Sequence, residues 1–354
     1  MAQSVTIRVN GSTDATVAAA TLVQVTERVG QSTQYRIEYS LDIAEGDFPL
    51  LKEGKLGPGA ELEVLSVTDD ATECLVKGPI YGQEVHFEHG GSGSSLIVVG
   101  ADSLIKMDRE DKAVAWTDVT DSDAVSSILS QAGLAADIES TSAGHFERKH
   151  TLIQRETDLA FVRRLARRNG NLFWVSCDPD GNETAHFKKP VLEGEAKCEL
   201  VVNLLEPRAN VMSLDLTWDV ERPTKAEATE IDLNSKSDIS GDVSRQPLTA
   251  LGGNGLADIV TDARVVHVRA PTDDNGDLQA RGEGALIESS FFVKASGSTT
   301  FSALKKVMRS HTLVNLEGVG SRHSGLWFCS AVTHSIDLTE HTMEFELIRN
   351  GWTN

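Results

Sequence analysis

The chain has 354 residues, with 33 Lys+Arg against 53 Asp+Glu and a formal net charge of −20 at pH 7. Hydrophobic residues make up 40% and charged residues 24%, proportions typical of a globular chain whose length predicts two or three domains. No stretch approaches the roughly 20 apolar residues that span a bilayer, and the acidic charge opposes non-specific binding to nucleic acid or to an anionic membrane surface.

The first 105 residues are expected to form short strands separated by turns. The N terminus lacks the basic start and apolar run of a secretory signal peptide, so the sequence does not predict export by that route. Between residues 35 and 43, Tyr35, Ile37 and Tyr39 alternate with polar residues, which predicts a strand with one buried face. Further strands are predicted at 5–9, 22–29, 62–67, 74–76, 84–88 and 96–99. Many short strands at this spacing are typical of a barrel or sandwich.

The pattern then changes to mixed helix and strand. A helix capped by Asp121 or Ser122 is predicted to run to about Ala132. A second helix is predicted at 157–169 because apolar residues recur there at helical spacing. A hairpin at 172–187 follows, with a turn rich in aspartate, proline and glycine. These elements predict a small α/β insert between two β regions.

Strands return after the insert and continue to the C terminus. They are predicted at 199–205, 211–218, 290–293, 312–316, 326–338 and 342–348. Residues 219–262 are polar and are expected to form a long loop or an extended excursion rather than a packed domain. This segment is expected to order only on assembly, because so few apolar side chains cannot offset the entropy of ordering it. A helix is predicted at 278–289. His334 lies on an apolar strand face and is expected to be a core or interface histidine.

The cysteines and histidines predict neither a disulfide framework nor a metal site. The four cysteines form no CxxC pair and favour a reduced interior with isolated buried thiols: Cys74, Cys177, Cys198 and Cys329. His86 and His89 form a close pair, but positions three apart on a strand face opposite sides and cannot converge on one metal ion.

The common catalytic and nucleotide-binding motifs are also absent. The spacings GxSxG, GxxxxGK[ST] and HExxH do not occur. The glycines at 253–255 and 318–320 are interpreted as tight turns. The acidic turns at 178–182 and 273–277 lack the glutamate that completes a calcium loop. The sequence therefore predicts no catalytic residue, no metal and no cofactor.

Four arginines form the densest cationic cluster of this acidic chain. They lie on the helix predicted at 157–169 and are Arg163, Arg164, Arg167 and Arg168. The simpler interpretation is a solvated helix face, which is what charge runs usually are. The alternative is a docking surface for an acidic neighbour.

Two segments resemble a known family. Gln154-x-Glu156-Thr157-Asp158-x-x-Phe161, followed by Leu165-Ala166, resembles the phage late-control D family, which includes the hub part of VgrG proteins. The segment 311–351 resembles the closing strands of the same family, through Gly-Val-Gly at 318–320, Ser-Gly-Leu-Trp at 324–327 and Arg-Asn-Gly at 349–351. Weaker matches at 37–48 extend the resemblance over most of the chain.

The resemblance implies a β-rich α+β fold with two tube-like β-barrel domains and a small α/β insert. The expected parts are a first barrel at 1–107, the insert at 108–190 and a second barrel at 191–354 carrying the polar loop at 219–262. It further implies a homotrimeric baseplate hub of a contractile tail or contractile injection system. Six barrels from three copies would meet a hexameric inner tube, and the threefold end would hold a trimeric spike. A symmetry adapter of this kind needs no catalytic residue.

The resemblance also implies partners and a location. VgrG proteins continue past the hub into a spike, whereas this sequence stops at Asn354, so the spike is expected to be a separate protein. Baseplate wedge proteins are further expected partners, whereas specific nucleic-acid binding and membrane insertion are not. Assembly is expected in the cytoplasm, into a virion tail or an injection-particle baseplate, and an acidic channel would let DNA or acidic cargo pass. Two alternatives are a tail-tip cell-wall hydrolase and a glycan- or host-recognition module.

Overall fold

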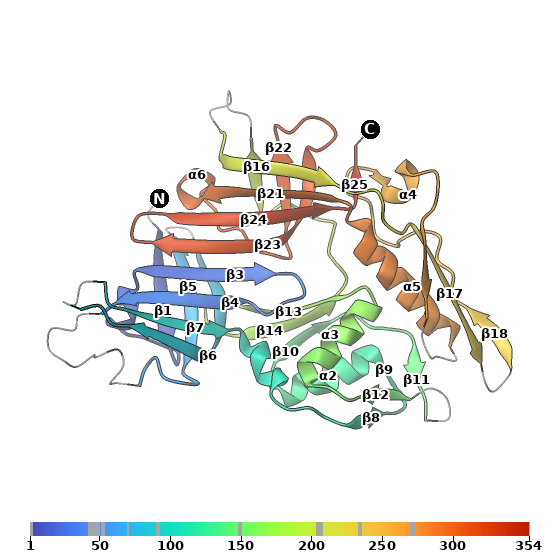
Figure 1. Ribbon diagram of the computed structural model, residues 1–354, viewed down its shortest axis with the longest axis horizontal. Helices are drawn as coiled ribbons and strands as arrows, with labels where there is room; N and C mark the ends of the chain where they lie inside the picture. Colours follow the sequence, from blue (N-terminus) through green and yellow to red (C-terminus); the bar gives the residue numbers. More distant parts are fainter. Residues whose placement is uncertain are drawn as a thin grey trace.

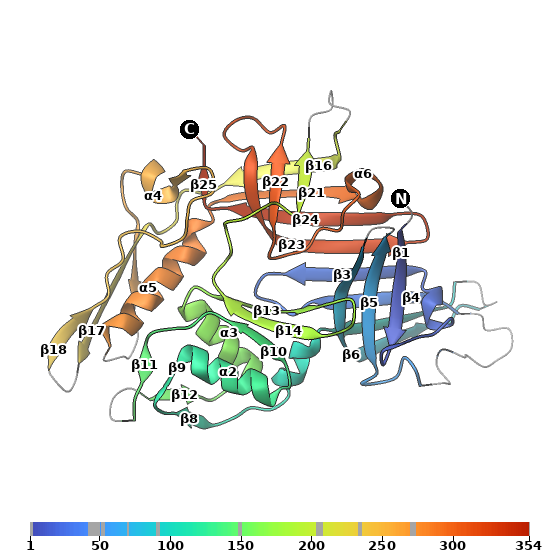
Figure 2. The same ribbon diagram turned by 180° about the vertical axis from the view of Figure 1, so that it is seen from behind.

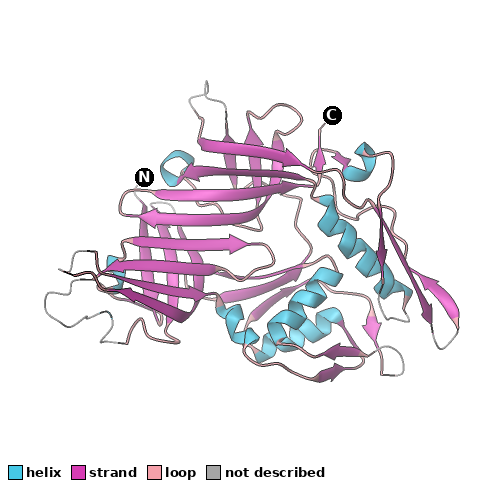
Figure 3. Cartoon of the chain, viewed as in Figure 1, coloured by secondary structure: helices cyan, strands magenta, loops and turns pink. Residues whose placement is uncertain are grey.

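A computed structural model describes residues 3–41, 50, 54–68, 71–89, 93–147, 151–202, 208–232, 236–269 and 274–353. Strands dominate, and the helices gather in the insert and beside one end of the main sheet (Figures 1 and 3). The predicted β-rich α+β class is confirmed.

One long antiparallel run joins strands from the N-terminal and C-terminal parts of the sequence. Strand β3, near the N terminus, pairs with β23, near the C terminus, over Leu22–Arg28 and Ala331–Asp337. Figure 1 shows the run face-on, from β16 at the top to β6 below. In spatial order its strands are β16 (Val211–Trp218), β21 (Val293–Thr300), β24 (His341–Arg349), β23 (Gly325–Asp337), β3 (Leu22–Arg28), β4 (Gln34–Ser40), β7 (Ser95–Ala101) and β6 (Thr72–His86).

The alternation of apolar and polar residues in β4 explains how one face of this sheet packs on the hydrophobic core. Tyr35, Ile37 and Tyr39 are almost fully buried, while the residues between them are half-buried on the opposite face. Burying such side chains contributes roughly 1.5–3 kcal/mol each relative to leaving them exposed. The strand predicted at 35–43 is thus confirmed as far as residue 40, and residues 42 and 43 lie outside the described part.

Strand β6 joins two layers of sheet. Its first half pairs with β5 (Glu61–Thr68) and its second half with β7, with a register shift between Ile80 and Gly82. Strand β5 in turn pairs with β1 (Gln3–Val9), which pairs with β2 (Ser12–Thr13). The strands predicted separately at 74–76 and 84–88 are therefore parts of one strand, which ends at His86.

The two expected barrels do not appear as separate closed units among the described residues. Strand pairing follows one open path from β16 to β2, and the β3–β23 pairing merges the two β regions. On the C-terminal side, β15 and β22 add to β23, and β25 pairs with β19; their bounds are Cys198–Val201, Leu313–Glu317, Gly351–Trp352 and Asn254–Gly255. The strand predicted at 199–205 ends at Val201, and residues 203–205 lie outside the described part.

The insert has its own hydrophobic core, built around Phe161, Phe173 and Phe187. Helix α2 (Asp121–Gln131) is capped by Thr120, whose hydroxyl accepts from the Asp123 amide, rather than by Asp121 or Ser122. The other elements are α3 (Asp158–Arg168), β8 (Val114–Trp116), β9 (Val119–Thr120), β10 (Ala135–Ile138), β11 (Gly144–His145), β12 (Leu152–Gln154), β13 (Leu172–Cys177) and β14 (Glu183–Lys188).

Residues 219–262 are not the single long loop expected. Strands β17 (Lys225–Asp232) and β18 (Ser237–Ser240) form a small sheet with β20 (Val265–Val268), and α5 (Asn275–Ser290) packs against it (Figure 2). Ala226 and Ala228 supply the buried face of β17, and small side chains of this kind gave no apolar signal in the sequence. The described residues also form short helices, which are α4 (Leu256–Ile259), α6 (Phe301–Leu304) and the 3-10 helices at Val17–Ala19 and Ser103–Asp108.

The expectation of isolated thiols is wrong for two of the four cysteines. Cys74 on β6 and Cys177 on β13 form a disulfide with a Cα–Cα distance of 5.6 Å. Because 103 residues separate them, their proximity arises from the packing of the insert beneath β6. Cys198 and Cys329 are free and buried, as expected.

Candidate functional site

The four arginines of α3 do not share one face of the helix. Arg164 and Arg167 are exposed, whereas Arg163 and Arg168 are partly covered by neighbouring elements. The helix begins at Thr157, whose hydroxyl accepts from the Ala160 amide, and its apolar side chains fill the core of the insert. Each arginine therefore meets a different environment.

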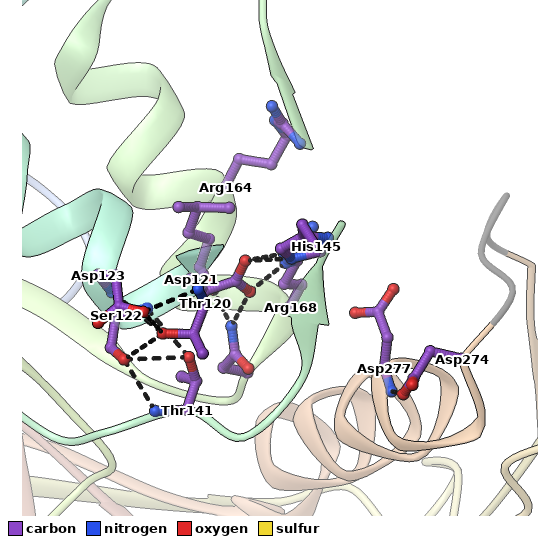
Figure 4. A network of polar contacts seen from close by, with 12 residues as sticks. Thr120, Asp121, Ser122, Asp123, Thr141, His145, Arg164, Arg168, Asp274 and Asp277 are labelled. Carbon is purple, nitrogen blue, oxygen red and sulfur yellow. Dashed lines mark hydrogen bonds and ion pairs between the residues drawn. The ribbon is translucent and has the colours of Figure 1, made fainter. Parts of the chain in front are cut away.

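Arg168 belongs to a buried polar network between the insert and α5 (Figure 4). It donates to both carboxylate oxygens of Asp121 and contacts His145, while the Asn169 amide donates to the same carboxylate at 2.7 Å. The Asp121 side chain is 1% exposed. Burial lowers the pKa of Arg168 to about 10, and Asp277 on α5 opposes that shift, so the guanidinium stays protonated at neutral pH.

Arg163 and Arg164 have partners within the chain. Arg163 donates to the Ser32 hydroxyl at 3.0 Å, while its Nε atom is buried without a hydrogen-bond partner among the described residues. Arg164 donates to Glu156 at 2.6 Å and to the carbonyl of Ile153, and it lies over the Phe161 ring. Arg163 thus links the insert to the first β region, and Arg164 forms its contacts within the insert.

Arg167, together with Arg163, lines a hollow on the molecular surface. This hollow has a volume of about 630 Å³ and lies where α3, α5 and the ends of β3, β21, β23 and β24 meet. Gly284 of α5 allows the close approach, because a Cβ there would lie 2.9 Å from the carbonyl oxygens of Arg167 and Arg168. The lining combines apolar side chains with five cations and two carboxylates.

One face of the long sheet is rich in small polar side chains. Thr26 and Thr333 lie within hydrogen-bonding distance across β3 and β23, as do Ser213 and Ser298 across β16 and β21. Gln24 also donates to the Ser335 hydroxyl. The exposed face therefore crosses the junction of the two β regions without a break in its polarity.

Both edges of the eight-strand run are exposed and carry apolar residues. Among the described residues, strand β16 pairs only with β21 and presents Met212 and Trp218, which are 70% and 59% exposed. Within the same described part of the chain, the second half of β6 pairs only with β7 and presents Tyr81 and Val85, which are 54% and 38% exposed. Unpaired edges with exposed apolar side chains are typical of strands that pair with another chain.

A serine–histidine–aspartate relay lies on the insert sheet. The Ser176 hydroxyl is 2.8 Å from His186 Nε2, and His186 Nδ1 is 2.8 Å from Asp137. Asp137 also pairs with Lys188, and the His186 ring stacks on Trp174 at 4.6 Å. Burial lowers the pKa of His186, and the hydrogen bond that the ring makes to the Asp137 carboxylate acts in the opposite direction. Trp174 also stacks on His311, so the relay stands at the contact between the insert and the second β region.

The described residues hold no cluster of three or more histidine, cysteine or carboxylate ligands suited to a metal ion. His86 approaches Glu88 rather than His89. His334 is fully buried and lies 3.0 Å from His341, so it is a core histidine. In the part of the chain that the structure covers, no helix has the length and hydropathy needed to cross a bilayer.

Comparison with known proteins identifies the family. The family model of the Alg8 N-terminal domain matches residues 1–338. The chain belongs to the Alg8 N-terminal domain family. No curated protein matches the sequence of this Alg8 N-terminal domain chain.

Solved structures share the fold of this Alg8 N-terminal domain over nearly its whole length. The 43 kDa tail protein of prophage MuSo2 from Shewanella oneidensis has a TM-score of 0.70 and 14% identity, covering 99% of both chains. A tail protein from Neisseria meningitidis MC58 has a TM-score of 0.69 and 13% identity, covering 99% of this chain and 98% of that one. The E. coli c3393 protein, described as a type VI secretion system component similar to the T4 tail proteins gp27 and gp5, has a TM-score of 0.61 and 14% identity, covering 98% and 79%.

These similarities confirm the resemblance to phage tail and VgrG-related proteins at the level of fold. The sequence located the strands and the arginine helix of this Alg8 N-terminal domain, but it did not locate the two sheet edges or the hollow. Those features depend on which strands lie outermost and on contacts between segments far apart in the sequence. Met212, Trp218 and Tyr81 are large apolar residues that the structure leaves exposed on edge strands. Their presence among polar residues in the sequence was the signal that could have indicated an edge in need of a partner.

Proposed function

We propose that the chain is a structural baseplate hub of a contractile tail or contractile injection system. Three copies would form a ring that joins a hexameric inner tube to a trimeric spike, with no catalytic turnover. It would assemble in the cytoplasm and remain in the baseplate of a virion tail or injection particle, in contact with wedge proteins. The fold shared with tail and type VI secretion proteins supports this assignment.

The observation that carries the proposal is the strand order of the long run. Four of its strands come from the C-terminal β region (β16, β21, β24, β23) and four from the N-terminal region (β3, β4, β7, β6). Three copies would supply six four-stranded units, which is the arrangement required to match a sixfold tube with a threefold hub. The proposed parts are a first β region at 1–107, the insert at 108–190 and a second β region at 191–354.

The directions of the strands support closure into a ring. Every neighbouring pair along the run is antiparallel, so β16 and β6, at positions one and eight, point in opposite directions. The β16 edge of one copy can therefore continue the antiparallel pattern with the β6 edge of the next. A head-to-tail contact of this kind closes into a ring when the rotation between copies fits.

The polar sheet face would line the channel of such a ring. Its two arginines at the centre are paired, Arg28 with Glu346 at 2.7 Å and Arg36 with Glu84 at 3.7 Å. Glu344 adds negative charge on the same face of β24. Lys294 of β21 also lies on this face and helps to lower the pKa of Glu346. A lining of hydroxyl groups in which carboxylates offset the cations suits the passage of DNA or acidic cargo without adhesion.

The proposal is tested by substitutions at the two edges. Tyr81→Asp and Met212→Asp each place a charge on an exposed edge and are expected to leave the fold of the single chain intact. Light scattering after size-exclusion chromatography should give about three times the 38.2 kDa chain mass for the wild type and the single-chain mass for both variants. Leu338→Asp is the matched control, since Leu338 is 85% exposed in the turn between β23 and β24. A wild-type chain that stays single in the presence of tube and spike proteins would contradict the hub.

The Ser176 relay favours one alternative, a cell-wall hydrolase carried at the tail tip. Serine, histidine and aspartate in this order form the geometry of nucleophilic acyl transfer. Release of peptidoglycan fragments by the purified chain, abolished by Ser176→Ala, would favour the hydrolase over the hub. A glycan-recognition module would instead bind a glycan array without affinity for the tube.

A further inference from the structure

The hollow beside α3 differs in charge from the rest of the molecule. The chain carries 53 acidic against 33 basic residues, yet the lining contains five cations and two carboxylates. The cations are Arg28, Arg163, Arg167, Arg222 and Lys294, and the carboxylates are Glu288 and Glu346. A concentration of positive charge on an acidic protein selects a partner of opposite charge.

Several of these cations are not neutralised within the chain. Arg28 pairs with Glu346, and Arg222 donates to the carbonyl of Phe291. Among the described residues, however, the side chains of Arg167 and Lys294 make no hydrogen bond and no ion pair within 4 Å, although Lys294 lies close enough to Glu346 to help lower the pKa of that carboxyl. Arg163 keeps a buried Nε donor without a partner, and buried donors are nearly always paired in a completed structure. Three donors lining one hollow thus have capacity for an incoming anion.

The remaining lining of the hollow is apolar. Ile287 of α5, Phe291 directly after that helix and Phe328 of β23 belong to one hydrophobic cluster beneath it. The volume of about 630 Å³ falls within the roughly 300–1,000 Å³ of sites that bind ligands. An inorganic anion would leave this apolar surface uncovered, whereas a peptide with both acidic and apolar side chains would cover both parts.

We propose that this hollow is a docking site for an acidic peptide segment of a partner protein, with an apolar side chain against Ile287 and Phe291 and carboxylates at Arg167 and Lys294. The site does not depend on ring formation, because all its residues come from one chain. The four arginines of α3 would then have different roles. Arg167 contacts the partner, Arg163 borders the site, and Arg164 and Arg168 have structural roles.

The test uses the full chain and fluorescein-labelled peptides in a polarisation titration at low salt. The acidic probe is Gly-Asp-Glu-Leu-Phe-Asp-Glu-Gly. One control replaces its carboxylates with the corresponding amides, and a second replaces Leu-Phe with Ser-Ser. Saturable binding of the acidic probe is expected, weakened by both controls and by added salt, which screens charges beyond about 3 Å at 1 M.

Charge-reversal variants assign the binding to the hollow. Arg167→Glu and Lys294→Glu should each weaken binding by about tenfold or more, because each replaces an attraction by a repulsion. Arg109→Glu, an exposed arginine of the insert away from the hollow, makes the same change in net charge and should alter affinity by less than about twofold. Unchanged thermal midpoints would show that all three variants are folded.

Four results would overturn the proposal. These are no saturable binding, equal binding of the amide control, an equal loss with Arg109→Glu and Arg167→Glu, and tighter binding of hexathymidylate than of the acidic probe. The first would leave the hollow without a peptide partner, and the others would indicate apolar association, diffuse charge attraction and a nucleic-acid site, respectively. None of them bears on the edge-strand test of the hub.

Discussion

Asp121 and Arg168 show how a single residue pair joins the two helices of the insert. Asp121 begins α2, Arg168 ends α3, and Asp277 on α5 lies across from them (Figure 4). A buried carboxylate is tolerated because a guanidinium and the Asn169 amide donate to it. Removing one partner leaves an uncompensated charge in a dry environment.

Arg168→Met is therefore expected to destabilise the chain by about 3 kcal/mol or more, since it keeps the side-chain bulk but leaves Asp121 without its cation. The measurement is urea unfolding followed by circular dichroism. Arg167→Met, one position earlier and exposed, is the matched control and should change the free energy of unfolding by less than about 0.5 kcal/mol. Equal small effects from both variants would show that the network contributes little to stability.

The buried pair His334 and His341 makes stability depend on pH. Burial lowers the pKa of His341 to about 4 and that of His334 well below its ordinary value of 6.5. Nearby positive charges lower the pKa of His334 further, whereas Glu340 acts against the lowering at His341. Between pH 6.5 and 4 the unfolded chain binds these protons while the folded chain does not. Stability is therefore full above pH 6.5 and falls as the pH drops toward 4, by about 1.4 kcal/mol per pH unit for each histidine.

His341→Gln should make this fall shallower by about one proton's contribution, because glutamine keeps a hydrogen-bonding side chain but does not titrate. The measurement is the free energy of unfolding in urea at a series of pH values. His89→Gln, at an exposed position, should reproduce the wild-type slope. An unchanged slope in His341→Gln would mean that other groups govern the acid sensitivity.

At the level of elements, the sequence predicted strands and helices wherever apolar side chains recur with a clear period. The alternation of Tyr35, Ile37 and Tyr39 located β4, and the helical spacing of Leu159, Val162 and Leu165 located α3. Strand β17 was not predicted because alanines occupy its buried positions, so its two faces differ little in hydrophobicity. Helix α5 was found three residues short of its start at Asn275, which Asp274 caps.

Contacts between distant elements could not be predicted from local patterns. The disulfide of Cys74 and Cys177 joins β6 to β13 only because the insert packs beneath the first β region. The separation of the four arginines has the same origin, since Ser32, Glu156 and Asp121 reach α3 from three different segments. The arginine cluster was visible in the sequence, but the identity of the arginine left free depends on tertiary packing.

At the scale of the whole molecule, the pairing of β3 with β23 decides the architecture. It places four strands from each β region in one antiparallel run, with exposed edges at β16 and β6 (Figure 1). One chain cannot pair these edges with each other while the run stays open. A ring of copies would satisfy both edges and would bury Met212, Trp218 and Tyr81 together.

The most direct measurement is the symmetry of the assembled particle in electron micrographs, viewed along its axis with tube and spike proteins bound. The hub account predicts a ring of three copies, with β16 of each copy beside β6 of the next and six similar four-stranded units around the channel. A ring with another number of copies, or contacts that leave β16 and β6 exposed, would contradict it.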